Sequence, residues 1–272
     1  MTGTDSKQAI LILSNGISKN VIKKYYKITK ATVDTADVFL LNHTANNKIP
    51  VGYEGIKIET FTDEILSNMG YTPIGKTLVP GSNHFPVLQF FLKYPGYTYY
   101  WCIEDDVSFS GNWNDFFKNI SANLDYDFIT SHIRKSSDVK GWPWWKSLSS
   151  PEEKVERREM WSSFNPIYRI SNKALQYIDT CLKRGYSGHH EVLMPTLLKK
   201  AGFKLADLGT KDNGVTSTLS YCTLTTMRWK PVYFVPGLKK NKLYHPVKAK
   251  VTFKQVLVYV KRTIYNQTEY FT

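Results

Sequence analysis

The chain has 272 residues, of which 42% are hydrophobic and 14% aromatic, a composition that excludes an intrinsically disordered protein and fits a globular domain. Its net charge of +13 is compatible with an anionic partner such as a nucleotide phosphate, an anionic lipid or nucleic acid. Three widely spaced cysteines, without a CxxC pair, argue against a structural zinc site or a disulfide framework.

Short apolar runs and helical patterns alternate along the N-terminal part of the chain. Ala9–Leu13 is an apolar run that ends at Ser14-Asn15-Gly16, which predicts a strand and a turn. Ser18 can cap the following helix, whose apolar positions include Val21, Ile22 and Tyr25. Asp37–Leu41 and Ile56–Thr60 predict two further strands. This order is typical of a mostly parallel sheet covered by helices, so we expect an α/β fold.

The middle of the chain is organised around one stretch, Tyr97–Trp113. Before it, Pro80-Gly81-Ser82-Asn83 predicts a turn that can cap a helix. The inner face of that helix would carry Val87, Leu88, Phe91 and Leu92. The stretch itself begins with aromatic and β-branched residues, as a strand buried on both faces does. Asn112 can cap the next helix, and Asp127–Ile133 predicts another strand.

The C-terminal half begins with an irregular, tryptophan-rich segment, Lys135–Trp161. A segment of this length without regular structure is usually functional or mobile. Asn172 can cap a helix that ends at Gly185. A second helix should start near His190, because Pro195 is tolerated only in a first turn. Phe203–Leu208 then predicts a short strand.

Three consecutive carboxylates, Glu104, Asp105 and Asp106, follow the buried run of the central stretch. Side chains alternate along a strand, so Glu104 and Asp106 should point one way and Asp105 the other. Acids at the end of a buried strand need a compensating cation or donor, and carboxylate oxygens suit Mg²⁺ or Mn²⁺. The alternative is a surface turn in which an acid bonds backbone amides.

Two later motifs could complete a site. Glu191 lies at the start of the second C-terminal helix, after the flexible Gly188, where a carboxylate could act as a general base. It could equally be an ordinary first-turn acid, favoured by the helix dipole. His245 precedes a proline, which favours an extended backbone that presents the side chain. A lone histidine is more often structural, although the lysines at 239, 240 and 242 could counter phosphate charge.

Taken in order, these features resemble the GT-A class of nucleotide-sugar glycosyltransferases, especially bacterial transferases of cell-surface polysaccharide or lipopolysaccharide assembly. The likeness runs from Ala9 to about Lys248, and Glu104-Asp105-Asp106 matches the acidic motif of the class with Glu in first place. It implies a single domain with a Rossmann-like GT-A fold. Residues 1–110 would form the nucleotide-sugar-binding half and residues 111–248 the acceptor-binding half.

The resemblance also implies roles for individual residues. Asp106, His245 and Glu104 would hold Mn²⁺ or Mg²⁺, and Glu191 would be the catalytic base. The nucleotide-sugar donor, with a UDP-sugar favoured, would contact Ser14, Asn15, Gly16, Gly81, Ser82, Asn83, Glu104, Asp105, Lys239 and Lys242. The saccharide or lipid-linked acceptor would contact Trp142, Trp144, Trp145 and His190, although the tryptophans could instead form a hydrophobic lid.

We therefore expect a metal-dependent, inverting glycosyltransferase of surface polysaccharide biosynthesis. The absence of an apolar signal region and of a membrane-length apolar run predicts a cytoplasmic protein. Residues 249–272 include an amphipathic, basic helical pattern that could rest on the inner face of a membrane, although such a pattern more commonly packs on its own domain.

Other classes of function stay open. A non-catalytic carbohydrate or anionic-surface binding protein would use the tryptophans and the basic surface, and would keep its function after Asp106→Asn. Nucleic-acid binding is disfavoured because the basic residues are scattered and no nucleic-acid module is recognisable. A phosphoryl or nucleotidyl transferase is possible, but no Walker-type phosphate loop is present.

Overall fold

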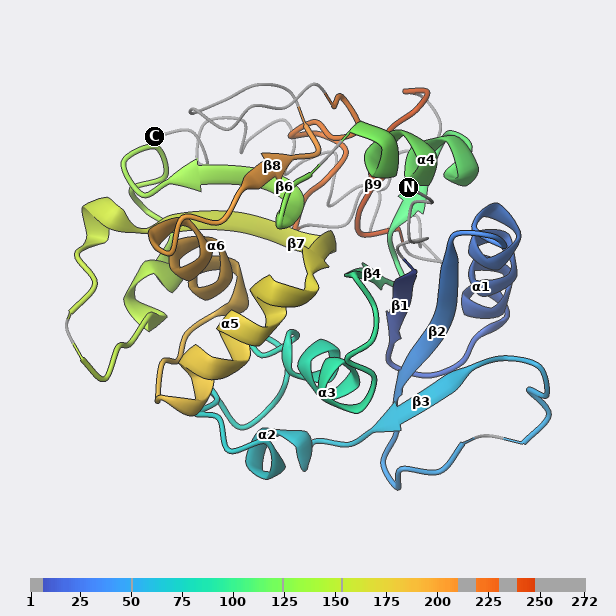
Figure 1. Ribbon diagram of the computed structural model, residues 1–272, viewed down its shortest axis with the longest axis horizontal. Coiled ribbons are helices and arrows are strands. Elements are labelled where there is room, and N and C mark those ends of the chain that lie inside the picture. The colour runs from blue at the N-terminus through green and yellow to red at the C-terminus, as the bar shows by residue number, and fades with distance from the viewer. Residues whose placement is uncertain are drawn as a thin grey trace, which may run out of the picture.

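A computed structural model describes residues 7–49, 51–123, 125–152, 154–209, 219–229 and 239–247. A seven-stranded sheet runs through the molecule in the order β3-β2-β1-β4-β7-β6-β8 (Figure 1). Its strands are β1 (Gln8–Ser14), β2 (Ala36–His43), β3 (Ile58–Phe61), β4 (Tyr99–Glu104), β6 (Phe128–Lys135), β7 (Trp161–Ser171) and β8 (Leu205–Asp207). All pairs are parallel except those of β7, which is antiparallel to both neighbours.

Helices cover both faces of the sheet, as Figure 1 shows. One face carries α1 (Lys19–Ala31) and α4 (Trp113–Asn123). The other carries α3 (Phe85–Lys93), α5 (Asn172–Lys183) and α6 (His190–Lys200), with the short α2 (Ile65–Asn68) beside them. Side chains alternate along β1, so Ile10 packs in the core under α1 and α4, and Leu11 packs in the core under α3, α5 and α6. The chain is therefore an α/β protein of the Rossmann-like, mostly parallel class that the sequence predicts.

Local details correct some of the expected helix features. Leu92, expected on the inner face of α3, is 45% exposed. α3 starts at Phe85 and its first turn has no side-chain cap. For α5 the cap is Ser171, whose hydroxyl accepts from the Ala174 amide, and not Asn172. Pro195 lies inside α6, beyond its first turn.

The strand β7 was not predicted at all, although it is central in the sheet. Its sequence, Trp-Ser-Ser-Phe-Asn-Pro-Ile-Tyr-Arg-Ile-Ser, lacks regular alternation and contains Pro166. Proline removes a ladder donor and normally argues against a central strand. Both neighbours of β7 are antiparallel to it, and register shifts interrupt its pairing with β6 between Ile129 and Arg134. The proline is therefore accommodated in an irregular ladder that local sequence does not reveal.

A second, two-stranded sheet joins distant parts of the chain. It pairs β5 (Ser108–Phe109) with β9 (Leu243–Tyr244) in antiparallel register. The Val247 amide also donates to the Asp106 carbonyl at 2.8 Å. This pairing places His245, which directly follows β9, beside the acidic triplet that ends β4.

The tryptophan-rich segment is anchored by short 3-10 turns, η1 (Pro143–Ser147) and η2 (Arg157–Glu159). Trp145 is 2% exposed and packs with Val155, Met160 and Val192. Its ring donates from Nε1 to the Val139 carbonyl at 2.7 Å. The segment therefore has a small core of its own, packed against α6.

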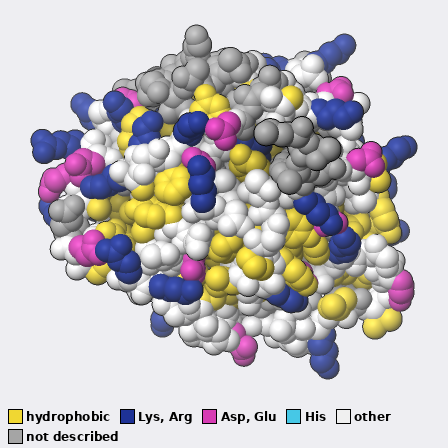
Figure 2. Space-filling model, viewed as in Figure 1, with side chains coloured by type: hydrophobic (Ala, Val, Ile, Leu, Met, Phe, Trp, Pro, Cys, Tyr) yellow, Lys and Arg dark blue, Asp and Glu magenta, His cyan; other side chains and the backbone are white. Residues whose placement is uncertain are grey.

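The visible face carries Lys and Arg side chains spread among other residues and not gathered into one stripe (Figure 2). Among the described residues, no helix has the length and apolar character needed to cross a bilayer. The amphipathic pattern of residues 249–272 lies outside the described residues.

Candidate active site

The carboxyl ends of β1 and β4 lie side by side, because the two strands are parallel and Leu13 pairs with Glu104. In open α/β sheets this edge is where ligands bind. The Ser14 hydroxyl donates to Asp105 Oδ2 at 2.8 Å, so Asp105 faces the turn after β1. In that turn the Gly16 amide donates to Asn42 Oδ1, at the end of β2, at 3.1 Å.

Glu104, Asp106 and His245 form a cluster on the opposite side of this loop from Asp105. His245 Nε2 lies 3.2 Å from Glu104 Oε2 and 3.2 Å from Asp106 Oδ1. One ligand atom from each residue lies within 4.8 Å of the others. The alternation predicted for the three acids is therefore present, and His245 meets the two that point together.

The ring of His245 is oriented by the backbone of the chain. Its Nδ1 donates to the Arg228 carbonyl at 2.8 Å, which directs Nε2 at the carboxylates. Burial alone would lower the pKa of His245, but hydrogen bonds to Asp106 and Glu104 raise it to about 9. The same Nδ1 contact would hold the neutral ring with the Nε2 lone pair directed at a cation, as backbone carbonyls bonded to the other ring nitrogen do for histidine ligands in metal sites.

This donor set fits a divalent cation. Two carboxylates supply the hard oxygen ligands that Mg²⁺ and Mn²⁺ prefer, and an imidazole nitrogen also binds transition metals. Three protein donors leave room for ligands from a substrate or water. The geometry needs no rearrangement of the strands, because β4 and the β5–β9 pair already bring the three side chains together.

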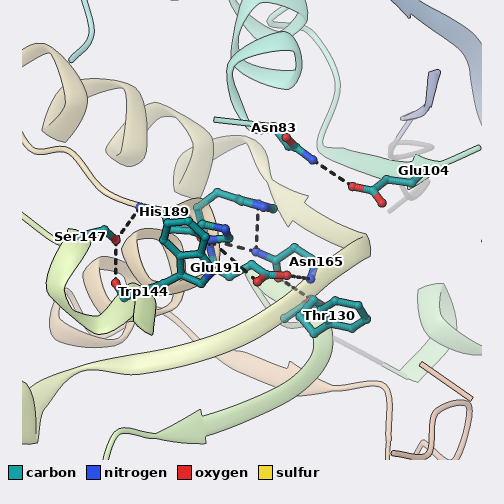
Figure 3. A network of polar contacts seen from close by, with 10 residues as sticks. Asn83, Glu104, Thr130, Trp144, Ser147, Asn165, His189 and Glu191 are labelled. Carbon is teal, nitrogen blue, oxygen red and sulfur yellow. Dashed lines mark hydrogen bonds and ion pairs between the residues drawn. The ribbon is translucent and has the colours of Figure 1, made fainter. Parts of the chain in front are cut away.

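The loop that was expected to contact a nucleoside, residues 81–83, reaches the same cluster. The Asn83 amide donates from Nδ2 to Glu104 Oε1 at 3.1 Å (Figure 3). Ser82 is 1% exposed and its amide donates to the Leu78 carbonyl. Asn83 therefore orients one of the candidate metal ligands, and Ser82 is part of the loop's own framework.

Gly81 links this loop to the start of α6 through a backbone hydrogen bond. We predict that Gly81→Ala destabilises the protein. Its φ of +103° disfavours any L side chain, and a Cβ there would lie 2.2 Å from Ile74 Cδ1 and 3.1 Å from His189 Cδ2. The Gly81 carbonyl also accepts from the His190 amide at 2.9 Å. We expect a loss on the order of 2 kcal/mol in the free energy of unfolding.

Denaturant unfolding followed by circular dichroism measures this loss. Gly75→Ala is the matched control, because its φ is not in the left-handed region and a Cβ there would meet nothing within 4 Å. Equal stabilities of the two variants would contradict the role given to Gly81.

Glu191 is the second residue of α6 and is largely buried. Burial raises its pKa to about 8. The hydrogen bond that Oε1 accepts from the backbone amide of Asn165, at 3.2 Å, acts in the opposite direction and lowers the pKa. The negative charge of Glu104 raises the pKa further and the charge of His245 lowers it. Glu191 is thus placed within electrostatic reach of the carboxylate–histidine cluster.

A polar network supports Glu191 from β6 and β7 (Figure 3). The Thr130 hydroxyl donates to Asn165 Oδ1 at 2.8 Å and so fixes the Asn165 side chain. The backbone amide of Asn165 donates to Glu191 Oε1. On the other side, His189 Nδ1 accepts from the Glu191 amide at 3.3 Å and caps the helix. Asn165 could not be found from the sequence because the strand that carries it was not predicted.

The expected acceptor residues divide into half-buried and buried ones. The Trp144 ring stacks on His189 at 4.5 Å between centroids, and the Trp142 ring meets the same histidine edge-on at 6.0 Å. Ser147 fixes this arrangement, because it accepts from the His189 amide and donates to the Trp144 carbonyl. Both rings are half-buried. Trp145 and His190 are buried, so neither presents a surface to an acceptor.

The two lysines expected to meet the donor lie beside the β5–β9 pair. Lys239 Nζ donates to Thr225 Oγ1 at 3.2 Å, and Lys242 Nζ contacts the carbonyl and hydroxyl of Ser220. Both ammonium groups therefore have protein partners in this structure, and contact with a donor would require them to exchange these partners.

Lys24 is a site residue that the sequence analysis missed. From α1 it reaches beneath the acidic loop and donates to the carbonyls of Glu104, Asp105 and Val107. Burial lowers its pKa to about 8, although the charges of Asp105, Asp106 and Glu104 act in the opposite direction. Its position among the other lysines of α1 carried no distinguishing signal in the sequence.

Part of the chain matches a known family, and the fold has relatives among solved structures. A model of a family described as "Protein of unknown function (DUF3405)" matches residues 27–125. No curated protein matches the chain. A similar solved structure is 4-diphosphocytidyl-2C-methyl-D-erythritol synthase from Anaerococcus prevotii DSM 20548, with a TM-score of 0.43, 11% identity, and coverage of 74% of this chain and 88% of that one.

Two further solved structures are similar over 63% of this chain at 12% identity and a TM-score of 0.31. One is a putative glucose-1-phosphate thymidylyltransferase from Bacillus anthracis, covered over 74% of its length. The other is a glycosyltransferase involved in the glycosylation of the major capsid of PBCV-1, covered over 64%. Nucleotidyl- and glycosyltransferases are thus both among the solved structures that the chain resembles.

Proposed function

We propose that the protein is a metal-dependent glycosyltransferase that moves a sugar from a nucleotide-sugar to a hydroxyl of a saccharide or lipid-linked acceptor. The observation that carries the proposal is the convergence of Glu104, Asp106 and His245, with a buried carboxylate, Glu191, in electrostatic reach. A cation site and a carboxylate with a raised pKa in one place are the parts that such a transfer needs.

The donor half of the site would be formed by the ends of β1 and β4. Glu104, Asp106 and His245 would hold Mn²⁺ or Mg²⁺, which when bound neutralises charge on the departing nucleoside diphosphate. The turn at Ser14-Asn15-Gly16 would receive the nucleoside, with UDP favoured. Asn83 would keep Glu104 oriented through its 3.1 Å hydrogen bond.

Glu191 would act as the base in this reaction. A carboxyl with a pKa near 8 is well matched to accepting a proton from an acceptor hydroxyl near neutral pH. The oxygen then forms a bond to the anomeric carbon as the bond to the diphosphate breaks, and a single displacement of this kind inverts the anomeric configuration. The proton stays on Glu191 until the products leave.

Trp142 and Trp144 would hold the acceptor. Their rings lie against His189, the residue that caps the helix carrying Glu191. Flat apolar rings pack well against sugar faces, so an acceptor on these rings would lie on the same side of α6 as the base. We place this activity in surface polysaccharide assembly in the cytoplasm, with membrane contact through residues 249–272 as a further part of the proposal.

The test is turnover of a panel of nucleotide-sugars by the full chain, with added Mn²⁺ or Mg²⁺ and with a chelator. We expect release of nucleoside diphosphate from at least one donor, abolished by chelation and restored by the cation. Sugar binding without turnover by any donor would instead favour the non-catalytic carbohydrate-binding alternative. Release of pyrophosphate from a nucleoside triphosphate would favour a nucleotidyltransferase, and either result would overturn the proposal.

A further inference from the structure

We infer that Lys24 is a positioning residue that preorganises the acidic loop for a divalent cation. The inference rests on the proposed metal site and adds a part of it that lies on a different element, α1. An ammonium group has three N–H donors and no acceptor. In this protein all three have carbonyl acceptors, those of Glu104, Asp105 and Val107.

The choice of carbonyls as partners has a direct consequence for the carboxylates. A lysine paired with the carboxylate oxygens would compete with a cation for the same lone pairs. Because the Lys24 donors go to the backbone, its positive charge lies beneath Asp105 and Asp106 while the side chains of Glu104 and Asp106 still point at His245. The lysine thus offsets part of the repulsion among three adjacent acids without occupying the cation site.

The same contacts determine the course of the chain after β4. The Asp105 amide donates to the Leu13 carbonyl and the Val107 amide to the Glu104 carbonyl, both at 3.0 Å, which completes a tight turn. The carbonyls of Glu104, Asp105 and Val107 accept from the Lys24 ammonium. The Glu104 carbonyl would keep the Val107 amide as a partner without the ammonium, but the partly buried carbonyls of Asp105 and Val107 would lose the donor they have here, at a cost typical of unsatisfied polar groups. The turn, and with it the direction of Asp106, would then relax.

The experiment compares Lys24→Met with Lys27→Met in the full chain. Lys27 lies on the same helix and is exposed, so its substitution changes the net charge equally without touching the turn. Mn²⁺ affinity is measured from the electron paramagnetic resonance signal of the free ion, at a temperature where circular dichroism shows both variants folded. We expect Lys24→Met to weaken Mn²⁺ binding by about 10- to 100-fold, the usual effect of removing a group that orients metal ligands, and Lys27→Met to leave it unchanged.

Amide hydrogen exchange of residues 104–107 without metal gives a second readout. Lys24→Met should accelerate exchange in this turn, and the milder Lys24→Gln, which keeps an N–H donor, should do so less and serves if the methionine variant does not fold. A folded Lys24 variant with wild-type Mn²⁺ affinity and wild-type exchange would overturn the inference. Failure of the wild-type chain to bind Mn²⁺ would instead refute the proposed metal site, and the exchange data would still test the role of Lys24 in the turn.

Discussion

Asp106→Asn is expected to abolish metal-dependent turnover, with a loss of about a thousandfold or more, while the fold is retained. The substitution removes one anionic ligand of the three that converge within 4.8 Å. Asparagine has nearly the same shape, but its amide is a weaker ligand and carries no charge to hold a cation. A loss of several kcal/mol in stabilisation of the departing diphosphate corresponds to a rate effect of this size.

The measurement is single-turnover release of nucleoside diphosphate, together with Mn²⁺ affinity of the same variant. Asp34→Asn is the matched control, because Asp34 is exposed and precedes β2, at the opposite end of the strands from the site. Asp105→Asn should be milder, since Asp105 pairs with Ser14 and not with His245. Full activity of Asp106→Asn at saturating Mn²⁺ would contradict the assignment of this residue as a ligand.

Glu191→Gln is expected to lower turnover by about 10²- to 10⁴-fold without loss of donor binding. Glutamine can still accept the hydrogen bond from the Asn165 amide, so the start of α6 should keep its structure. What it cannot do is accept a proton. If Glu191 is the base, turnover by the wild-type protein should rise with pH through about 8, the raised pKa of Glu191, because only the deprotonated carboxylate can accept the proton.

The same substitution should stabilise the protein at high pH. The folded-state pKa of Glu191, about 8, is above the ordinary glutamate value of 4.5, so the folded wild type binds a proton more tightly than the unfolded chain does. Wild-type stability is therefore lost as pH rises from about 4.5 to about 8, and is not lost further above that range. Relative to wild type, Glu191→Gln should gain on the order of 5 kcal/mol in unfolding free energy over this interval, because each pKa unit corresponds to about 1.4 kcal/mol.

Thermal unfolding at a series of pH values, with Glu54→Gln as an exposed control, measures this gain. A variant that is inactive but no more stable than wild type at pH 9 would show that the carboxyl is not buried in its neutral form. A variant that is stabilised but fully active would show that Glu191 is structural and that the base lies elsewhere.

The fold class was predictable because β1, β2 and β4 are apolar runs bounded by turn residues, and because Ser18 and Asn112 cap helices at the expected places. These are local signals. The strand β7 escaped prediction because its pairing, and not its own composition, keeps Pro166 within the sheet.

The site was predictable to the extent that its residues carry chemistry of an unusual kind. Three adjacent acids after a buried strand, and a carboxylate at a helix start, stand out in a sequence. The partners that orient them do not. Lys24 is one of many lysines, and the Arg228 carbonyl that directs His245 is a backbone group with no sequence signature. Such contacts arise only from tertiary packing.

The β5–β9 pairing has a consequence for how the protein folds. Glu104 and His245 are separated by 141 positions along the chain, and only the closure of this very long loop brings them together. Closing such a loop is slow and entropically costly, and no partly folded form with an isolated N-terminal half can contain all three donors. A cation bound by Glu104, Asp106 and His245 would therefore link the end of β4 to the residue that follows β9, and would stabilise the folded state against opening of this long loop.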